Sequence, residues 1–129
     1  MFIEARTKKS PRQAGEALEK AAKERKFGVL HVHNVTETLT SKGLTFEREM
    51  YIYEVCNPFA AKKVLDTNPR ISTAMPCRVS VYSDGDETVI VTMKPTVMLE
   101  MFNEPTLRNV AQEVEEVMGE MVREAARDE

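Results

Sequence analysis

The chain has 129 residues, of which 42% are hydrophobic and 30% charged, with a net charge of −3 at neutral pH. This length and balance are typical of one soluble globular domain with one hydrophobic core, and residues 1–129 are expected to form it. Acidic and basic residues are interleaved, so no basic face is available for phosphates and nucleic-acid binding is not expected. The chain has no bilayer-length apolar run and no signal-peptide pattern, so we expect a cytoplasmic protein without a membrane partner.

The first half of the chain predicts a strand, a helix and two further strands. Residues 2–5 are apolar enough for the first strand. Residues 11–27 predict a helix, because a serine–proline pair opens the segment and alanines recur at helical spacing. Residues 29–38 are rich in β-branched side chains and predict a second strand, followed by a polar loop over residues 40–45. Residues 47–56 predict a third strand with side chains alternating between two faces.

The second half predicts two strands joined by a tight turn, and three helices. An asparagine–proline pair opens a short helix over residues 59–66. Residues 73–82 and 87–93 predict strands four and five, because an Asp-Gly turn signal separates them. Residues 96–102 predict a second short helix. Residues 105–122 predict the longest helix, since apolar side chains recur along one stripe.

The predicted order of elements is β-α-β-β-α-β-β-α-α. Strands joined by hairpins or short connections favour an α+β fold, with an antiparallel five-stranded sheet packed on one face by helices. The first and last helices carry the best apolar stripes, so we expect both to lie on the sheet.

The two cysteines are predicted to meet at one edge of that sheet. If strands two to five form an antiparallel meander, His31, Cys56, Cys77 and Met93 fall at the same edge. Two thiols, an imidazole and a thioether would suit a soft metal ion such as copper or zinc, or thiol and persulfide chemistry. The helix that follows Asn57 would point its positive N-terminal end at Cys56 and favour the thiolate.

Each of these residues also has a purely structural interpretation. Cys77 alternates with two valines, and a cysteine in such a strand is more often a buried core residue than a functional one. Simple alternation puts His31 and His33 on one face of the second strand, and Leu30 and Val32 on the other. Such a histidine pair is more often without a metal than with one. No CxxC motif, glycine-rich phosphate loop or Gly-x-Ser-x-Gly motif occurs in the sequence.

Five short motifs, spread over nearly the whole chain, have a distinctive order and spacing. They are Phe27-Gly28-Val29-Leu30, Cys56-Asn57-Pro58-Phe59, Asn68-Pro69, Met75-Pro76-Cys77-Arg78 and Met93-Lys94-Pro95. In these motifs the chain resembles the domain-of-unknown-function family numbered 302. The resemblance implies a compact α+β domain similar to the TATA-box-binding-protein-like fold, β-α-β(4)-α, that usually forms a homodimer. It also implies a loose association with sulfur metabolism, but no biochemical activity and no particular cofactor.

Three functions are therefore open. The first is a homodimeric binding module for a small sulfur species or a soft metal ion, with Cys56, Asn57, Cys77, His31 and Met93 as candidate ligand-binding residues. Among these, Cys56, Cys77 and His31 are the candidate metal ligands. The second is a thiol or persulfide transfer enzyme, with Cys56 as nucleophile, Cys77 as assisting thiol and His31 as base. The third is a structural or regulatory interaction domain in which the cysteines are chemically silent.

Overall fold

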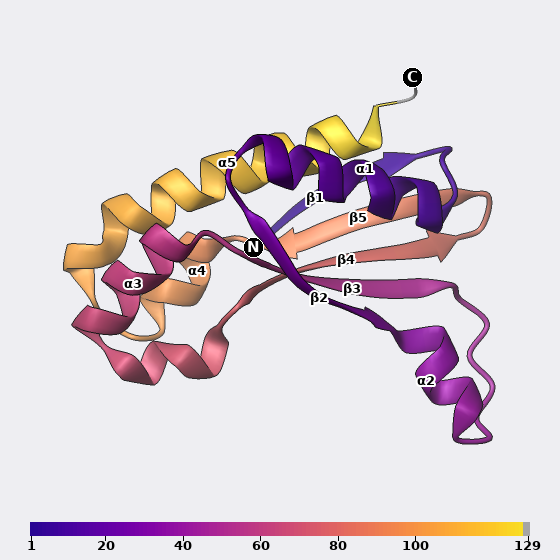
Figure 1. Ribbon diagram of the computed structural model, residues 1–129, viewed down its shortest axis with the longest axis horizontal. Helices are drawn as coiled ribbons and strands as arrows, with labels where there is room; N and C mark the ends of the chain where they lie inside the picture. Colours follow the sequence, from indigo (N-terminus) through magenta and orange to yellow (C-terminus); the bar gives the residue numbers. More distant parts are fainter. Residues whose placement is uncertain (128–129) are drawn as a thin grey trace.

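The computed structural model describes residues 1–127, and within them one five-stranded antiparallel sheet carries helices on one face (Figure 1). This confirms the predicted α+β class. The strands are β1 Phe2–Thr7, β2 Gly28–Asn34, β3 Met50–Cys56, β4 Cys77–Asp84 and β5 Glu87–Met93. The α-helices are α1 Pro11–Glu24, α2 Val35–Ser41, α3 Pro58–Thr67, α4 Pro95–Glu100 and α5 Arg108–Ala126, and two 3-10 helices are η1 Pro69–Ala74 and η2 Pro105–Leu107.

The strands lie in the order β1-β5-β4-β3-β2, and all neighbours are antiparallel. Strands β2 to β5 therefore form the predicted meander, while β1 closes the sheet beside β5. Helices α1 and α5 lie side by side across one face (Figure 1), which confirms where the first and last helices pack. The core lies between this helical layer and the sheet, where fully buried side chains come from both: Leu18, Met118, Met121, Val122, Val55, Val79, Val81 and Ile90.

Helix α1 begins where its sequence signals place it. The Ser10 hydroxyl accepts a hydrogen bond from the Gln13 amide at 3.2 Å, and the Gln13 side chain accepts one from the Ser10 amide at 3.1 Å. This reciprocal pair satisfies amides that have no partner within the helix. Across the described residues, 1–127, none of the helices is long and apolar enough to cross a membrane.

The second strand is shorter than predicted, because a helix starts inside the segment. Asn34 ends β2 and caps α2, its Oδ1 accepting a hydrogen bond from the Glu37 amide at 3.0 Å. The Asn34 Nδ2 group also donates to the Glu37 carboxylate at 3.3 Å. The prediction of strand up to residue 38 was therefore wrong, and the predicted loop over residues 40–45 begins only after Ser41. Side-chain capping outweighs the strand preference of the β-branched residues that follow Asn34.

A bulge at Leu30 changes which side chains of β2 face the core. The pairing with β3 shifts between Val29 and His31, so Leu30 is an extra residue that is 61% exposed. Val29 and Val32 then pack against the core, and His31 and His33 turn to the uncovered face of the sheet. The two histidines do share a face, as predicted. Val29 faces the core beside Val32, although simple alternation would place Val29 on the face of the histidines, because simple alternation does not allow for a bulge.

The fourth strand begins four residues later than predicted. Residues Pro69–Ala74 form η1, and the Asn68 side chain caps it by accepting a hydrogen bond from the Arg70 amide at 3.0 Å. Only after this turn does the chain enter β4 at Cys77. The third strand likewise begins at Met50 instead of residue 47.

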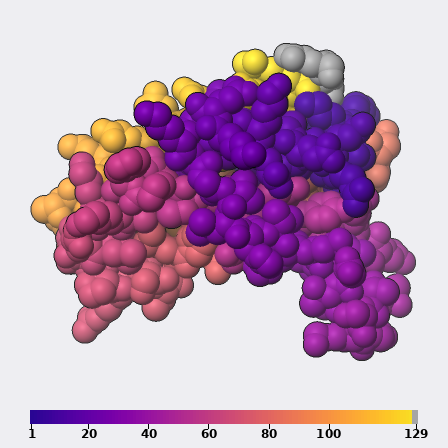
Figure 2. Space-filling view, viewed as in Figure 1, coloured from indigo at the N-terminus to yellow at the C-terminus, as the bar shows by residue number. Residues whose placement is uncertain are grey.

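The face of the sheet opposite α1 and α5 is flanked by two projections. Helix α2 projects at one end, and the segment containing α3 and η1 projects at the other, with a notch between them (Figure 2). The second of these projections, together with α4, encloses the edge at which the cysteines lie.

Candidate functional site

The strand register brings the two cysteines together, as the meander predicted. Val55 of β3 pairs with Cys77 of β4, and Cys56 is the next residue along β3, opposite Gly28. Cys56 and Cys77 are both free thiols. Met93 ends β5 at the same edge, opposite Phe2 of β1. Two sulfur atoms twenty-one positions apart in the sequence thus reach one corner of the fold.

Both cysteines line a cavity of about 90 Å³, which we call the thiol pocket. Besides Cys56 and Cys77, it is lined by two further sulfur-bearing residues, Met75 and Met98, and by the polar residue Asn57. The rest of the wall is hydrocarbon, from Phe27, Val55, Ala60, Ala61, Val64, Ile71, Ala74, Pro76, Pro95, Leu99, Phe102, Leu107, Val110, Ala111 and Val114. The pocket is thus a sulfur-bearing hollow in an apolar surround.

The thiol pocket exists because three short helical segments fold back around the end of the sheet. Helices α3 and α4 and the turn η1 stand around the ends of β3, β4 and β5, under the first part of α5 (Figure 1). Pro58 and Pro95 each occupy the first turn of a helix, where a missing amide costs nothing. The sharp strand-to-helix corner at Cys56-Asn57-Pro58 turns the chain out of the sheet and leaves the Cys56 side chain at the pocket wall.

Burial in this apolar wall keeps both thiols protonated. Burial raises the pKa of the Cys56 thiol above its ordinary value. For Cys77 the pKa is raised to about 11, chiefly by burial and further by the charge that Cys56 would carry. Desolvation disfavours the thiolate, because an apolar wall cannot solvate the charge. At neutral pH both groups are therefore weak nucleophiles.

The expected activation of Cys56 by the N-terminus of α3 was wrong. The amides of Phe59 and Ala60 at that end both donate to Asn57 Oδ1, at 3.1 and 3.3 Å. Asn57 thus occupies the anion-binding position itself, as the capping residue. It lines the thiol pocket as predicted, but its side-chain oxygen is already used by the helix.

His31 does not join the cysteines. It pairs with Glu54 in the ladder and packs edge-on against His33, with ring centroids 4.3 Å apart, on the uncovered face of the sheet. The His33 Nε2 atom lies 2.8 Å from the Glu54 carboxylate, and this contact lowers the pKa of Glu54. Across residues 1–127 no three His, Cys, Asp or Glu side chains gather as a metal site. The structure therefore does not assemble the predicted metal ligands Cys56, Cys77 and His31.

Met93 lies beside the thiol pocket instead of in it. It lines a second hollow on the uncovered side of the sheet edge, together with Phe2 and Arg78. Cys77 and Met98 line both this hollow and the thiol pocket. These two sulfur-bearing residues therefore belong to the walls of both hollows.

Met75 and Met98 are pocket residues that the sequence analysis did not identify. Met98 lies at the pocket wall on α4. Met75 offered a signal, because it stands in the same short motif as Cys77. No periodicity marks Met98, since its approach to the cysteines depends on how α4 folds back.

Comparison with known proteins shows the family of this chain and a solved structure that it resembles over nearly its whole length. Residues 3–125 match the family model described as a domain of unknown function, DUF302. A crystal structure of an uncharacterized conserved DUF302 protein from Bacillus stearothermophilus is 34% identical and superposes with a TM-score of 0.92, covering 98% of each chain. No curated protein matches the chain.

Proposed function

Because the chain belongs to the DUF302 family, for which no function is known, we propose a function from the pocket itself: the protein binds a small, uncharged or soft ligand between Cys56 and Cys77. A small sulfur compound and a soft metal ion are the two ligand classes that this wall would accept. The observation that carries the proposal is the apolar cavity of about 90 Å³ with two cysteines in its wall.

The size and chemistry of the thiol pocket limit its ligand. Apolar cavities of about 150 Å³ stay dry and take up molecules such as benzene or xenon. A cavity of about 90 Å³ suits a smaller ligand with only a few non-hydrogen atoms. Among the described residues of the wall none is charged, so an anionic ligand such as a polysulfide would be buried without a counter-charge, at a high cost.

Thiol or persulfide transfer is less well supported than binding. A nucleophilic cysteine acts as the thiolate, and its environment normally lowers the pKa. Here burial raises the pKa of both thiols. His31, the predicted base, lies with His33 on the uncovered sheet face. These observations favour binding of a ligand in the pocket over nucleophilic attack on the ligand by a cysteine.

Methionine methyl groups provide a direct probe of binding. In protein labelled with ¹³C at the methionine methyls, Met75 and Met98 report on the thiol pocket, and Met101, which is 72% exposed, is an internal control. We would titrate reduced protein with methanethiol, a neutral sulfur compound at pH 7, and separately with Cu(I). Saturable shifts of Met75 and Met98, with Met101 unmoved, are expected for at least one probe.

Two results would contradict the proposal. One is the absence of any shift at Met75 and Met98 with both probes at millimolar concentration. The other is an equal response from a Cys56→Ser/Cys77→Ser variant, which keeps the shape of the wall but removes both thiols. Far-UV circular dichroism of this variant checks that the fold is retained.

The homodimer and the cytoplasmic location implied above remain predictions. Sedimentation equilibrium of untagged protein measures the mass of the species in solution. We expect twice the monomer mass at micromolar concentration, and a monomer mass would contradict the homodimer. The pocket lies within one chain, so the binding proposal does not depend on this outcome.

A further inference from the structure

Four sulfur-bearing side chains reach the thiol pocket from separate parts of the chain. Cys56 comes from the end of β3, Met75 from the loop after η1, Cys77 from the start of β4, and Met98 from α4. Among the described residues of the wall, none has a carboxylate or an imidazole. The Asn57 oxygen is occupied by two amides of α3. Sulfur is therefore the electron-pair donor that the pocket offers to a ligand.

We propose that the thiol pocket binds Cu(I), with the Cys56 and Cys77 sulfurs as ligands and the Met75 and Met98 thioethers as weaker, supporting ligands. This deepens the proposed function and rests on it. Thiolate and thioether ligands are soft and select Cu(I) over harder ions. In the binding step the copper remains monovalent, and each cysteine that binds it releases its proton to solvent. No oxidant or reductant is consumed.

The donor set argues against other common metal ions. Zinc takes four nitrogen, oxygen or thiolate ligands in a tetrahedron, and across residues 1–127 no third such residue stands beside the cysteines. Magnesium and calcium require oxygen ligands, which the wall does not provide.

A second observation points to the same ligand. The hollow on the uncovered side of the sheet edge is lined by Met93, Met98 and Cys77. Met93 is 36% exposed, while Met98 and Cys77 also line the thiol pocket. Sulfur-bearing residues thus line both hollows, and Met93 is exposed at the surface. This arrangement would allow Cu(I) to pass inward by exchange from one sulfur to the next.

The experiment is an anaerobic titration of Cu(I) against a colorimetric Cu(I) chelator that competes with the protein. We expect one Cu(I) per chain and a thiolate-to-copper charge-transfer band in the ultraviolet spectrum. Cys56→Ser and Cys77→Ser should each weaken binding by more than about 10-fold, the effect that even changes outside the ligand shell have on metal sites. Met98→Leu should weaken binding by a smaller factor and leave the band in place.

Matched variants keep the test decisive. Met101→Leu changes an exposed methionine three residues from Met98 and should leave the affinity for Cu(I) unchanged. Met98→Leu conserves volume, so it tests the site even if a cysteine variant fails to fold. Affinity for Cu(I) that is the same in wild type and in Cys56→Ser/Cys77→Ser would overturn the inference. If methanethiol shifts the Met75 and Met98 methyls but Cu(I) binds without the cysteines or not at all, the copper inference fails while the proposed binding function stands.

Discussion

Gly15 of α1 lies directly against the phenol ring of Tyr53 of β3. A side chain at Gly15 would collide with the Tyr53 hydroxyl oxygen, and its Cβ would lie 2.7 Å from the ring carbon that bears it. Tyr53 is 5% exposed and lies in the main core. The missing side chain of Gly15 therefore sets how closely α1 can approach the sheet.

Gly15→Ala is expected to destabilise the fold by about 1–3 kcal/mol, the usual cost of overpacking a core. The gain in helix propensity from glycine to alanine offsets only about 1 kcal/mol. Gly119→Ala in α5 is the control, since its Cβ would meet the flexible end of Arg123 at 3.1 Å. Urea unfolding measures both. A Gly15→Ala variant as stable as the wild type would show that α1 is free to shift.

Tyr53 should make the fold sensitive to alkaline pH. Burial raises the pKa of Tyr53 to about 12, with further contributions from Glu19 and Tyr51. The folded-state pKa lies above the unfolded value, so the stabilisation is complete below about pH 10 and is lost as the pH rises toward 12. A difference of two pKa units corresponds to roughly 2–3 kcal/mol, which is the largest loss in the free energy of unfolding expected from the ionisation of Tyr53.

The measurement is the free energy of unfolding of wild type and Tyr53→Phe at pH 9 and pH 11.5. The wild type should lose more stability than the variant between these two pH values, because phenylalanine has no proton to lose. Equal losses would show that Tyr53 ionises as readily in the folded chain as in the unfolded one.

The two thiols should be alkylated slowly at neutral pH. Single-cysteine variants, Cys77→Ala and Cys56→Ala, allow the rate of reaction with iodoacetamide to be followed for each cysteine as a function of pH. Because burial raises both pKa values, each rate should still be rising above pH 9, and Cys77 should need a higher pH than Cys56. A rate for Cys56 that levels off near pH 7 would instead support thiol-transfer chemistry.

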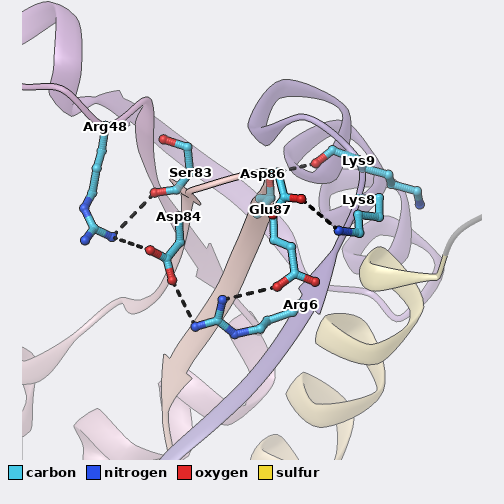
Figure 3. Close-up of polar contacts among 9 residues, drawn as sticks. Arg6, Lys8, Lys9, Arg48, Ser83, Asp84, Asp86 and Glu87 are labelled. Carbon is cyan, nitrogen blue, oxygen red and sulfur yellow. Dashed lines mark hydrogen bonds and ion pairs between the residues drawn. The ribbon is translucent and has the colours of Figure 1, made fainter.

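Asp84 links the sheet edge to the loop before β3 (Figure 3). Its carboxylate lies 3.0 Å from Arg6 and 3.9 Å from Arg48, and the Arg48 guanidinium also lies 5.2 Å from the centre of the Tyr82 ring. All three charged side chains are at least two-fifths exposed, so the ion pairs are screened by solvent and salt.

Asp84→Asn should lower the urea midpoint slightly in dilute buffer and have no effect in 1 M salt, where the screening length falls to about 3 Å. Asp86→Asn is the control in the same hairpin, because the contact of Asp86 with Lys8 at 3.4 Å joins two highly exposed side chains. If the urea midpoint of Asp84→Asn is still lower than that of the wild type in 1 M salt, Asp84 stabilises the fold through local hydrogen bonding instead of its charge.

The sheet, its meander and the two main helices could be predicted because local signals agree with the final packing. Alternation marks the inner face of β3 and β4, and the Ser10-Pro11 pair starts α1 where the capping box forms. The cysteine edge follows from strand direction alone, so it needed no knowledge of side-chain contacts.

The predictions that were wrong concern places where a single residue overrides a regular sequence pattern. The Leu30 bulge places Val29 on the core face of β2, beside Val32. Asn34 ends that strand, although the Asn34–Glu37 spacing is itself a helix-start signal. The set of pocket residues could not be predicted, because Met98 reaches the cysteines only through the way in which α4 turns back under α5.

The most direct test of the binding pocket is a crystal of the reduced protein soaked in methanethiol and measured at a wavelength where sulfur scatters anomalously. We predict one additional sulfur peak inside the thiol pocket, between Cys56 and Cys77, that is absent from unsoaked crystals and from Cys56→Ser/Cys77→Ser crystals. A soaked wild-type crystal with the pocket unchanged, or with added sulfur only on the outer surface, would contradict the central claim.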